Sequence, residues 1–330
     1  MIEVKHLTKR YGGHVAVDDL SFTIEKGTIY GFLGPNGAGK STTMNIITGC
    51  LGATEGEVLI GGHSIMDDPK PAKKLIGYLP EQPPVYPDMT VKEYLMFVAE
   101  AKRVNRAERI QSIENAISKT GLEDVKGRLI RNLSKGYRQR VGIAEALLGD
   151  PEIIILDEPT VGLDPTQMIE IRSLIQELGK EHTVILSSHI LSEVQAVCNT
   201  IMIISKGKLV ASDTSENLTR LFAGSSVLKI EASADIENVN KLLENVEGIS
   251  EITLKKTEGS VNFIDIAVQD GADIRKDVFS AFAQAGIPLF EMHTERASLE
   301  DVFLELTKET EPEERKKRRG RAKRKEAEEV

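Results

Sequence analysis

Short apolar runs alternate with amphipathic stretches over roughly the first two thirds of the chain. Apolar runs of about four to eight residues are typical of buried strands, and an apolar repeat near 3.6 residues is typical of helices. The runs predicted as strands are Val17–Ile24, Ile29–Leu33, Glu57–Ile60, Leu75–Leu79, Ile153–Leu156, Val184–Ser187 and Ile201–Ile204. Lys206-Gly207 predicts a tight hairpin into a further strand, Lys208–Ala211. Strands that alternate with helices predict a mostly parallel sheet with helices on both faces.

One long segment interrupts this alternation. Val91–Leu148 is mostly helical in pattern and contains no convincing strand. We therefore predict a helical subdomain, over about residues 85–150, inserted between two halves of the sheet. Together they form an α/β domain that is predicted to span residues 1–219.

Beyond Gly224 the pattern changes to the order β-α-β-β-α-β. The predicted elements are Val227–Ile230, Ile236–Val246, Ile249–Leu254, Val261–Val268, Ile274–Ala285 and Ile287–Met292, with a hairpin connection at 257–260. This order is that of a ferredoxin-like domain. A small C-terminal α+β domain is therefore predicted over residues 225–308, with a last helix at Leu299–Leu306. It carries no catalytic constellation, so we interpret it as a packing or dimerisation module.

Composition supports a soluble chain of about two domains. Of the 330 residues, 40% are hydrophobic, yet no run approaches the ~18–20 apolar residues of a membrane span. The N-terminus lacks the apolar segment of a signal peptide, which favours a cytoplasmic location. Cys50 and Cys198 have no metal-ligand spacing, and we expect both to be small core residues in a reducing compartment.

The net charge of −9 conceals a strongly basic run at residues 315–325. A dense run of like charges without apolar periodicity predicts a disordered tail, over residues 309–330. Such a tail could lie on anionic lipid, contact nucleic acid, or simply remain solvated. No aromatic residue is interleaved to stack on bases, which disfavours nucleic acid as a partner.

The strongest chemical signal is a glycine-rich loop after the strand Ile29–Leu33. The loop reads, in order, Gly34, Pro35, Asn36, Gly37, Ala38, Gly39, Lys40, Ser41 and Thr42. A helix is predicted from Thr42 to Thr48, and its first amides would converge with those of the loop on an anion. Lys40 could then reach the β- and γ-phosphates of a nucleotide, while the Ser41 hydroxyl could ligate Mg²⁺. The pattern predicts a phosphate-binding P-loop.

Two acids end the apolar strand Ile153–Leu156, in the pattern of a Walker B motif. The carboxyl ends of strands are where α/β sheets place their ligands. Asp157 is placed to hold Mg²⁺ through water, and Glu158 is placed to polarise the water that attacks the γ-phosphate. We therefore predict an ATPase site with ATP and Mg²⁺ as its ligands.

Further motifs surround the Walker B strand. They are Leu133–Arg140 before it, Pro159–Asp164 directly after it, and Leu186-Ser187-Ser188-His189 at the next strand. With the P-loop, this set resembles the nucleotide-binding subunit of ABC transporters over residues 2–215. The resemblance implies an ABC-type P-loop ATPase fold. It also implies that Tyr11 stacks on adenine and that His189 contacts the γ-phosphate.

The same resemblance assigns residues to partners. Gln82 would sense the Mg²⁺ site and contact a transmembrane permease. Asp164 would bridge two nucleotide-binding subunits, identical or related. Ser134 and Gly136 of one subunit would cap the ATP bound by the other. They would lie at the N-terminus of a helix predicted over Arg138–Leu148, where amides can face phosphate.

The motif around Ser134 departs from the common Leu-Ser-Gly-Gly-Gln, since Lys135 and Tyr137 replace a glycine and the glutamine. This variant, and the ending Ala297–Thr307, are similar to the multidrug and gliding-motility branch of exporters. The resemblance thus implies an ATP-hydrolysing subunit on the inner face of the cell membrane that energises a separate permease for export. The alternatives are a non-transport ABC ATPase that acts on nucleic acid, and a regulator of a soluble partner.

Overall fold

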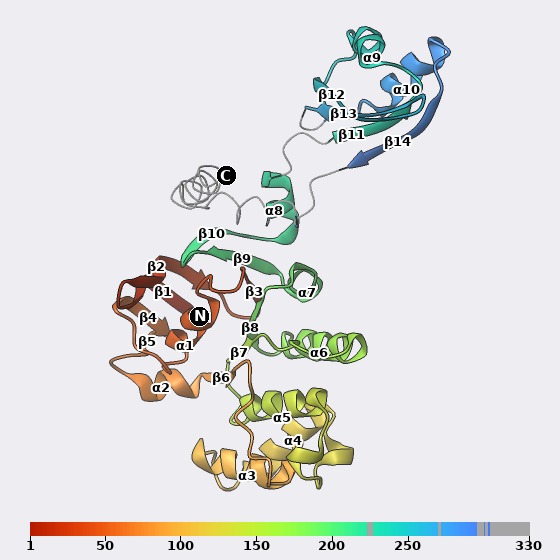
Figure 1. Ribbon diagram of the computed structural model, residues 1–330. Coiled ribbons are helices and arrows are strands. Elements are labelled where there is room, and N and C mark those ends of the chain that lie inside the picture. The colour runs from red at the N-terminus through yellow and green to blue at the C-terminus, as the bar shows by residue number, and fades with distance from the viewer. Residues whose placement is uncertain (223–226, 270–271, 296–299, 301–302, 304–330) are drawn as a thin grey trace, which may run out of the picture. The chain divides into compact units, whose positions relative to one another are not determined.

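The structure is a computed structural model that describes residues 1–222, 227–269 and 272–295, together with residues 300 and 303. The chain divides into two compact units, one built on Met1–Ser215 and the other on Glu216–Glu305. Figure 1 shows their elements. The α/β class predicted from the hydrophobic pattern is confirmed, and each unit is taken in turn below.

The larger sheet of the first unit has six strands in the order β10-β9-β3-β8-β7-β6. They are β3 (Ile29–Leu33), β6 (Ile76–Leu79), β7 (Ile153–Asp157), β8 (Thr183–Ser188), β9 (Thr200–Ser205) and β10 (Lys208–Asp213). All pairs are parallel except β9 with β10, which form the hairpin predicted at Lys206-Gly207. Both turn residues have positive φ, 50° and 79°, as this kind of tight turn requires. Every residue of β3, β7 and β8 is buried.

Two of the predicted strands do not belong to this sheet. Val17–Ile24 and Glu57–Ile60 lie in a second, antiparallel sheet with the order β2-β1-β4-β5. Its strands are β1 (Ile2–Tyr11), β2 (His14–Ile24), β4 (Glu55–Ile60) and β5 (His63–Ser64). The prediction of one mostly parallel sheet was therefore incomplete. A two-residue loop joins Tyr11 to its partner His14, and such a short loop can connect only antiparallel neighbours.

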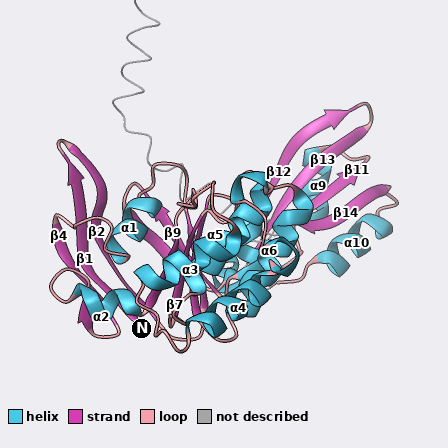
Figure 2. Cartoon of the chain, turned by 90° about the horizontal axis from the view of Figure 1, so that it is seen from below, coloured by secondary structure: helices cyan, strands magenta, loops and turns pink. Residues whose placement is uncertain are grey.

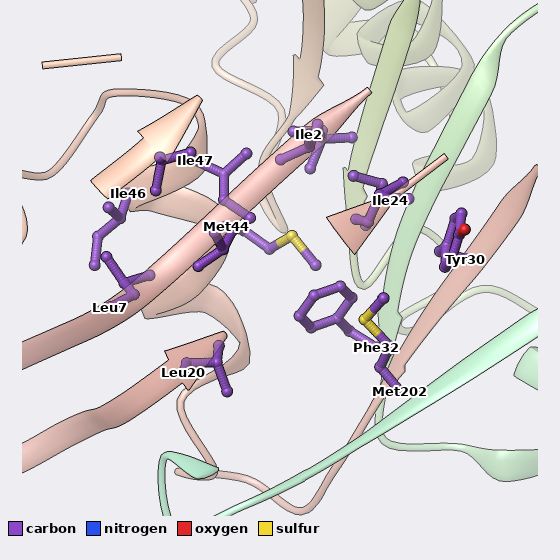
Figure 3. Close-up of a cluster of buried hydrophobic side chains, with 14 of the residues drawn as sticks. Ile2, Leu7, Leu20, Ile24, Tyr30, Phe32, Met44, Ile46, Ile47 and Met202 are labelled. Carbon is purple, nitrogen blue, oxygen red and sulfur yellow. The ribbon is translucent and has the colours of Figure 1, made fainter. Parts of the chain in front are cut away.

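The core of the first unit lies between the two sheets. Helix α1 (Lys40–Ile47) contacts both β2 and β7, and its buried side chains meet apolar residues from the facing strands. Figure 3 shows this cluster, in which Met44 of α1 lies among Ile2, Phe32 and Met202. This packing fixes the start of α1, and therefore the loop before it, at the carboxyl end of β3 in the main sheet.

The other helices complete the first unit. Helix α7 (Leu191–Val197) contacts β3 and β8, and α6 (Pro165–Leu178) contacts α7. The short α2 (Pro69–Lys74) contacts β5 and β6. The segment predicted to be helical holds α3 (Val91–Ala101), α4 (Arg109–Thr120), two 3₁₀ turns (Glu123–Val125 and Ile130–Asn132) and α5 (Lys135–Leu147). These helices lie together at the bottom of Figure 1.

Local signals explain where two of these helices begin. Before α3, the Thr90 hydroxyl accepts a hydrogen bond from the Glu93 amide, and the Glu93 carboxylate accepts one from the Thr90 amide. Helix α5 begins at Lys135, three residues before the predicted start at Arg138. Ser134 is its N-cap and accepts a hydrogen bond from the Tyr137 amide at 3.3 Å.

The second unit has the predicted β-α-β-β-α-β order. Its elements are β11 (Val227–Ala232), α9 (Ile236–Leu243), β12 (Ile249–Glu258), β13 (Val261–Val268), α10 (Arg275–Gln284) and β14 (Leu289–Glu295). The antiparallel sheet has the order β12-β13-β11-β14, which is ferredoxin-like (Figure 2). The alternating burial of β11 and β13 turns Leu228, Ile230, Ile264 and Ile266 towards one core with α9 and α10. Helix α8 (Ser215–Phe222) comes before β11 in the chain, at the start of this unit.

Several sequence predictions concern residues at or beyond the ends of the described ranges. The helix at Leu299–Leu306 lies outside the described residues apart from Glu300 and Phe303, and the tail at 309–330 lies wholly outside them. The domain boundaries at 219 and 225 stay predictions. No helix in the described part of the chain is long and apolar enough to cross a membrane.

The two cysteines differ from each other. Cys50 lies in the turn after α1 and is exposed, so the prediction that it is a core residue was wrong. Cys198 ends α7 and is half-buried, and burial raises the pKa of its thiol. Helical pattern alone does not separate a helix from the exposed turn that follows it.

Candidate nucleotide-binding site

The glycine-rich loop joins the end of β3 to the start of α1. Gly39 has φ = 103° and stands directly before the helix, in a conformation that side chains rarely adopt. A Cβ on Gly34 would lie 2.3 Å from the Ile204 carbonyl oxygen, so the loop lies too close to β9 for any side chain there. The backbone is thereby held where the first amides of α1 can face an anion.

Lys40 is buried at the start of α1, with 6% of its surface exposed. Its ammonium group donates to the Gly34 carbonyl at 2.7 Å and to the Pro35 carbonyl at 3.4 Å. The same nitrogen lies 3.5 Å from Glu158 Oε1. The lysine is thus folded into its own loop and paired with Glu158, the acid directly after β7.

Asp157 is the last residue of β7 and is buried. Its Oδ1 accepts a hydrogen bond from the Ser41 hydroxyl of α1 at 3.3 Å and another from the Ser187 hydroxyl of β8. The hydroxyl of Ser41 and the carboxylate of Asp157 are hard oxygen donors of the kind Mg²⁺ prefers. The predicted pair of metal-site residues therefore meets in the structure, and its donor set fits that cation.

Glu158 follows Asp157 with φ = 48°, in the left-handed region that costs a residue with a side chain about 1–3 kcal/mol. Its amide donates to the Ser187 hydroxyl at 2.9 Å. Its Oε2 lies 2.9 Å from His189 Nδ1, while its Oε1 faces Lys40. A buried carboxylate between a lysine and a histidine can accept a hydrogen bond from a water beside a phosphate.

A cavity of about 380 Å³ opens over these groups. It is lined by Tyr11, His14, Ala16, residues 36–42, Glu81, Glu158, Val161 and His189. Tyr11, at the end of β1, is 48% exposed, and Lys9 Nζ lies 5.3 Å from the centre of its ring. The P-loop, Tyr11 and His189 are therefore brought together. Gln82 does not line this cavity, whereas its neighbour Glu81 does, and both side chains are exposed.

The remaining predicted residues gather in a second cavity of the same unit, of about 570 Å³. Ser134, Gly136 and Asp164 line it together with residues of α5 and α6. Asp164 is the N-cap of α6 and accepts a hydrogen bond from the Gln167 amide at 2.9 Å. The two cavities share no lining residue. One chain therefore carries two separate groups of predicted nucleotide contacts.

Sequence reasoning missed the buried polar residues that support the site. Glu193 of α7 accepts hydrogen bonds from the Thr160 hydroxyl at 2.6 Å and the Ser188 hydroxyl at 3.0 Å. Ser187 bonds to both Walker B acids, as described above. The available signal was the pair of serines that ends an otherwise apolar strand, which calls for buried hydrogen-bond partners.

One tyrosine beside the site is electrostatically perturbed. Burial raises the pKa of Tyr78 on β6, and the charge of Asp157 raises it further. The phenol therefore stays neutral, and its hydroxyl donates to Asn45 Oδ1 of α1 at 3.2 Å. This bond ties the P-loop helix to β6.

A strand, a glycine-rich loop and a helix bring a lysine, a hydroxyl and a strand-end acid to one cavity, and a second strand-end acid accepts a hydrogen bond from that hydroxyl. Together these features define a P-loop ATPase. The ABC transporter family model matches residues 17–161. The chain is 37% identical over 322 residues to the uncharacterised ABC transporter ATP-binding protein YhcH of Bacillus subtilis, covering 95% of this chain and 98% of that protein. The linearmycin resistance ATP-binding protein LnrL of the same organism is 32% identical, with 94% and 99% covered.

Solved structures agree with this assignment. A dimeric ATP-binding cassette in a post-hydrolysis state, bound to ADP and Pi, is 28% identical with a TM-score of 0.59, and 65% of this chain and 98% of that chain are covered. The chain belongs to the family of ABC transporter ATP-binding proteins. It is the ATP-binding subunit of an ABC transporter, and its first unit is the ATPase.

Proposed function

We propose that two copies of this chain, or one copy and a related subunit, close around ATP, each supplying half of every site. The observation that carries this proposal is the separation of the predicted contacts into two cavities that share no residue. In a twofold head-to-tail pair, the P-loop cavity of one subunit would face Ser134 and Gly136 of its partner. The dimeric state of the similar ADP-bound cassette supports the arrangement.

Within each P-loop cavity, different residues bind different parts of the nucleotide. Tyr11, exposed at the cavity rim, stacks on the adenine ring. Lys40 exchanges its bonds to the loop carbonyls for bonds to the β- and γ-phosphates. Ser41 and Asp157 would hold Mg²⁺, and Gln82 would join them once its exposed loop moves to the site; the cation would neutralise phosphate charge when bound.

Hydrolysis depends on Glu158 and His189. Glu158 accepts a hydrogen bond from the attacking water and orients it towards the γ-phosphate. His189, within 2.9 Å of that carboxylate, contacts the γ-phosphate and keeps the glutamate in place. Loss of the γ-phosphate removes the charge that holds two subunits together, so the pair opens.

This cycle would drive a separate transmembrane permease, contacted through the Gln82 loop. The subunit would therefore lie on the inner face of the cell membrane, where the basic tail could contact anionic lipid. Export is the direction we favour, because the relative LnrL is a linearmycin resistance ATP-binding protein. The transporter names of relatives that match over nearly the whole chain favour this function over a nucleic-acid or regulatory role.

The catalytic assignment is tested by Glu158→Gln. The amide keeps the shape of the side chain but is a poor base, so ATP turnover should fall by about 10²- to 10⁴-fold. Equilibrium binding of ATP should persist, because the P-loop contacts remain. Phosphate release and binding of a fluorescent ATP analogue measure the two effects.

The matched control is Glu152→Gln, which makes the same chemical change just before the other end of β7, at a residue paired with Lys26 on the surface. It should keep turnover within about twofold of the unaltered protein. Equal turnover in both variants would remove Glu158 from the catalytic role.

A further inference from the structure

Ser187 is a fully buried hydroxyl at the centre of the main sheet. It lies on β8, between the P-loop strand β3 and the Walker B strand β7, and none of its surface is exposed. The parallel register places it opposite Phe32 on one side and Asp157 on the other. A buried hydroxyl is costly unless hydrogen-bonded, so its partners matter.

Both partners belong to the Walker B motif. The Ser187 hydroxyl donates to Asp157 Oδ1 and accepts from the Glu158 amide at 2.9 Å. A serine hydroxyl has one donor and two acceptor positions, so it can make both bonds at once. A single side-chain atom thereby connects the orientation of the metal-site acid to the backbone of the catalytic acid.

These two bonds act on the features that the site needs. Glu158 has the strained φ of 48°, and its amide points into the sheet, where Ser187 supplies an acceptor. Asp157 Oδ1 receives a hydroxyl from each side, Ser41 from α1 and Ser187 from β8, which limits rotation of the carboxylate. Without Ser187, a buried amide would lose its partner and the carboxylate one of its two hydroxyl donors.

We propose that Ser187 is a positioning residue for ATP hydrolysis, which sets the Asp157 carboxylate for the cation and the Glu158 carboxylate for the attacking water. The inference rests on the proposed function of those two acids. Ser187 acts only through them and does not line the nucleotide cavity. Its removal should therefore impair the chemical step and the metal dependence more than the binding of nucleotide itself.

The test begins with Ser187→Ala. A displacement of about 1 Å at reacting groups can cost about 100-fold in rate, so kcat should fall by about 10- to 100-fold while KM for ATP changes less than about threefold. A second readout avoids activity altogether. In titrations of a fluorescent ATP analogue, the Mg²⁺ concentration that half-saturates binding should rise several-fold, while binding without Mg²⁺ stays within about twofold.

Two further variants separate positioning from stability. Ser187→Thr restores the hydroxyl with one extra methyl group and should recover most of the lost kcat and the Mg²⁺ response. Thr183→Ala removes another buried hydroxyl of the same strand, which accepts from the Gly27 amide at 2.9 Å at the opposite end. That control should lower the melting temperature without changing the Mg²⁺ response.

The results separate the positioning role of Ser187 from the catalytic role of Glu158. If Ser187→Ala matches Thr183→Ala in kcat and Mg²⁺ response while Glu158→Gln is inactive, the positioning role is wrong and the catalytic assignment stands. A Thr variant as impaired as the Ala variant would also overturn it. If Glu158→Gln retains full turnover, the proposed function itself fails.

Discussion

At the scale of single residues, the proposed chemistry depends on a buried lysine and two buried acids, together with an exposed histidine that contacts one of the acids. Glu158 lies 3.5 Å from Lys40 and 2.9 Å from His189. Asp157 accepts a hydrogen bond from Ser41, which lines the same P-loop cavity. The sequence predicted these residues because each belongs to a motif with a fixed order along the chain. It did not predict Ser187, because its role depends on which strands are neighbours and in what register.

The contact between His189 and Glu158 leads to a prediction about His189→Ala. We expect turnover to fall by about 100-fold, because the glutamate loses a neighbour and the γ-phosphate loses a donor. ATP binding should change little, since the P-loop is unaltered. Phosphate release and analogue binding measure these effects.

His63→Ala is the control, because His63 in β5 makes a similar contact, with its Nδ1 3.0 Å from Asp68 Oδ2, and it does not line the P-loop cavity. It should retain full turnover. If His189→Ala behaves in the same way as His63→Ala, the histidine has no part in hydrolysis.

At the scale of elements, hydrophobic period predicted most strands and helices but not their assembly. Val17–Ile24 was a correct strand assigned to the wrong sheet, because an apolar run does not identify its partner. Helix α5 begins earlier than its apolar period indicated, because Ser134 caps it. Helix capping depends on local hydrogen bonds and strand pairing depends on tertiary contacts, and the spacing of apolar residues predicts neither.

Helices α3 and α5 meet at a half-buried acid, Glu145, which gives a pH-dependent prediction. Burial raises the pKa of Glu145, more than the Tyr94 hydrogen bond and the Lys102 charge lower it. The Tyr94 hydroxyl donates to Glu145 Oε2 at 2.5 Å. Because the folded-state pKa lies above the unfolded value, the free energy of unfolding should fall as pH rises through that interval.

Glu145→Gln keeps an acceptor for Tyr94 and removes the charge. The free energy of unfolding of the variant, relative to that of the unaltered protein, should therefore be higher at pH 8 than at pH 5. Glu114→Gln is the control: hydrogen bonds from Lys126 and Lys92 lower the pKa of Glu114, so its charged form is stabilised at both pH values and the loss of stability should be about the same at pH 5 and pH 8. Urea unfolding at both pH values, followed by circular dichroism, measures each difference from the unaltered protein. A pH-independent effect of Glu145→Gln would contradict the argument.

At the scale of the whole molecule, the proposed pairing of subunits rests on two separate groups of predicted nucleotide contacts in one chain. The P-loop cavity and the Ser134 cavity lie in the same unit without a common lining residue. The motif order predicted both halves, and the resemblance implied their pairing. The cargo is not encoded in these residues, because none of them would contact it.

The most direct test of this account is the mass of the Glu158→Gln protein in solution, measured by sedimentation with saturating ATP and Mg²⁺. The account predicts a dimer that forms with ATP, dissociates with ADP, and is abolished when Gly136→Asp is added to the same chain. A protein that binds ATP yet keeps the mass of one chain, alone and with any related subunit from its own cell, would contradict it.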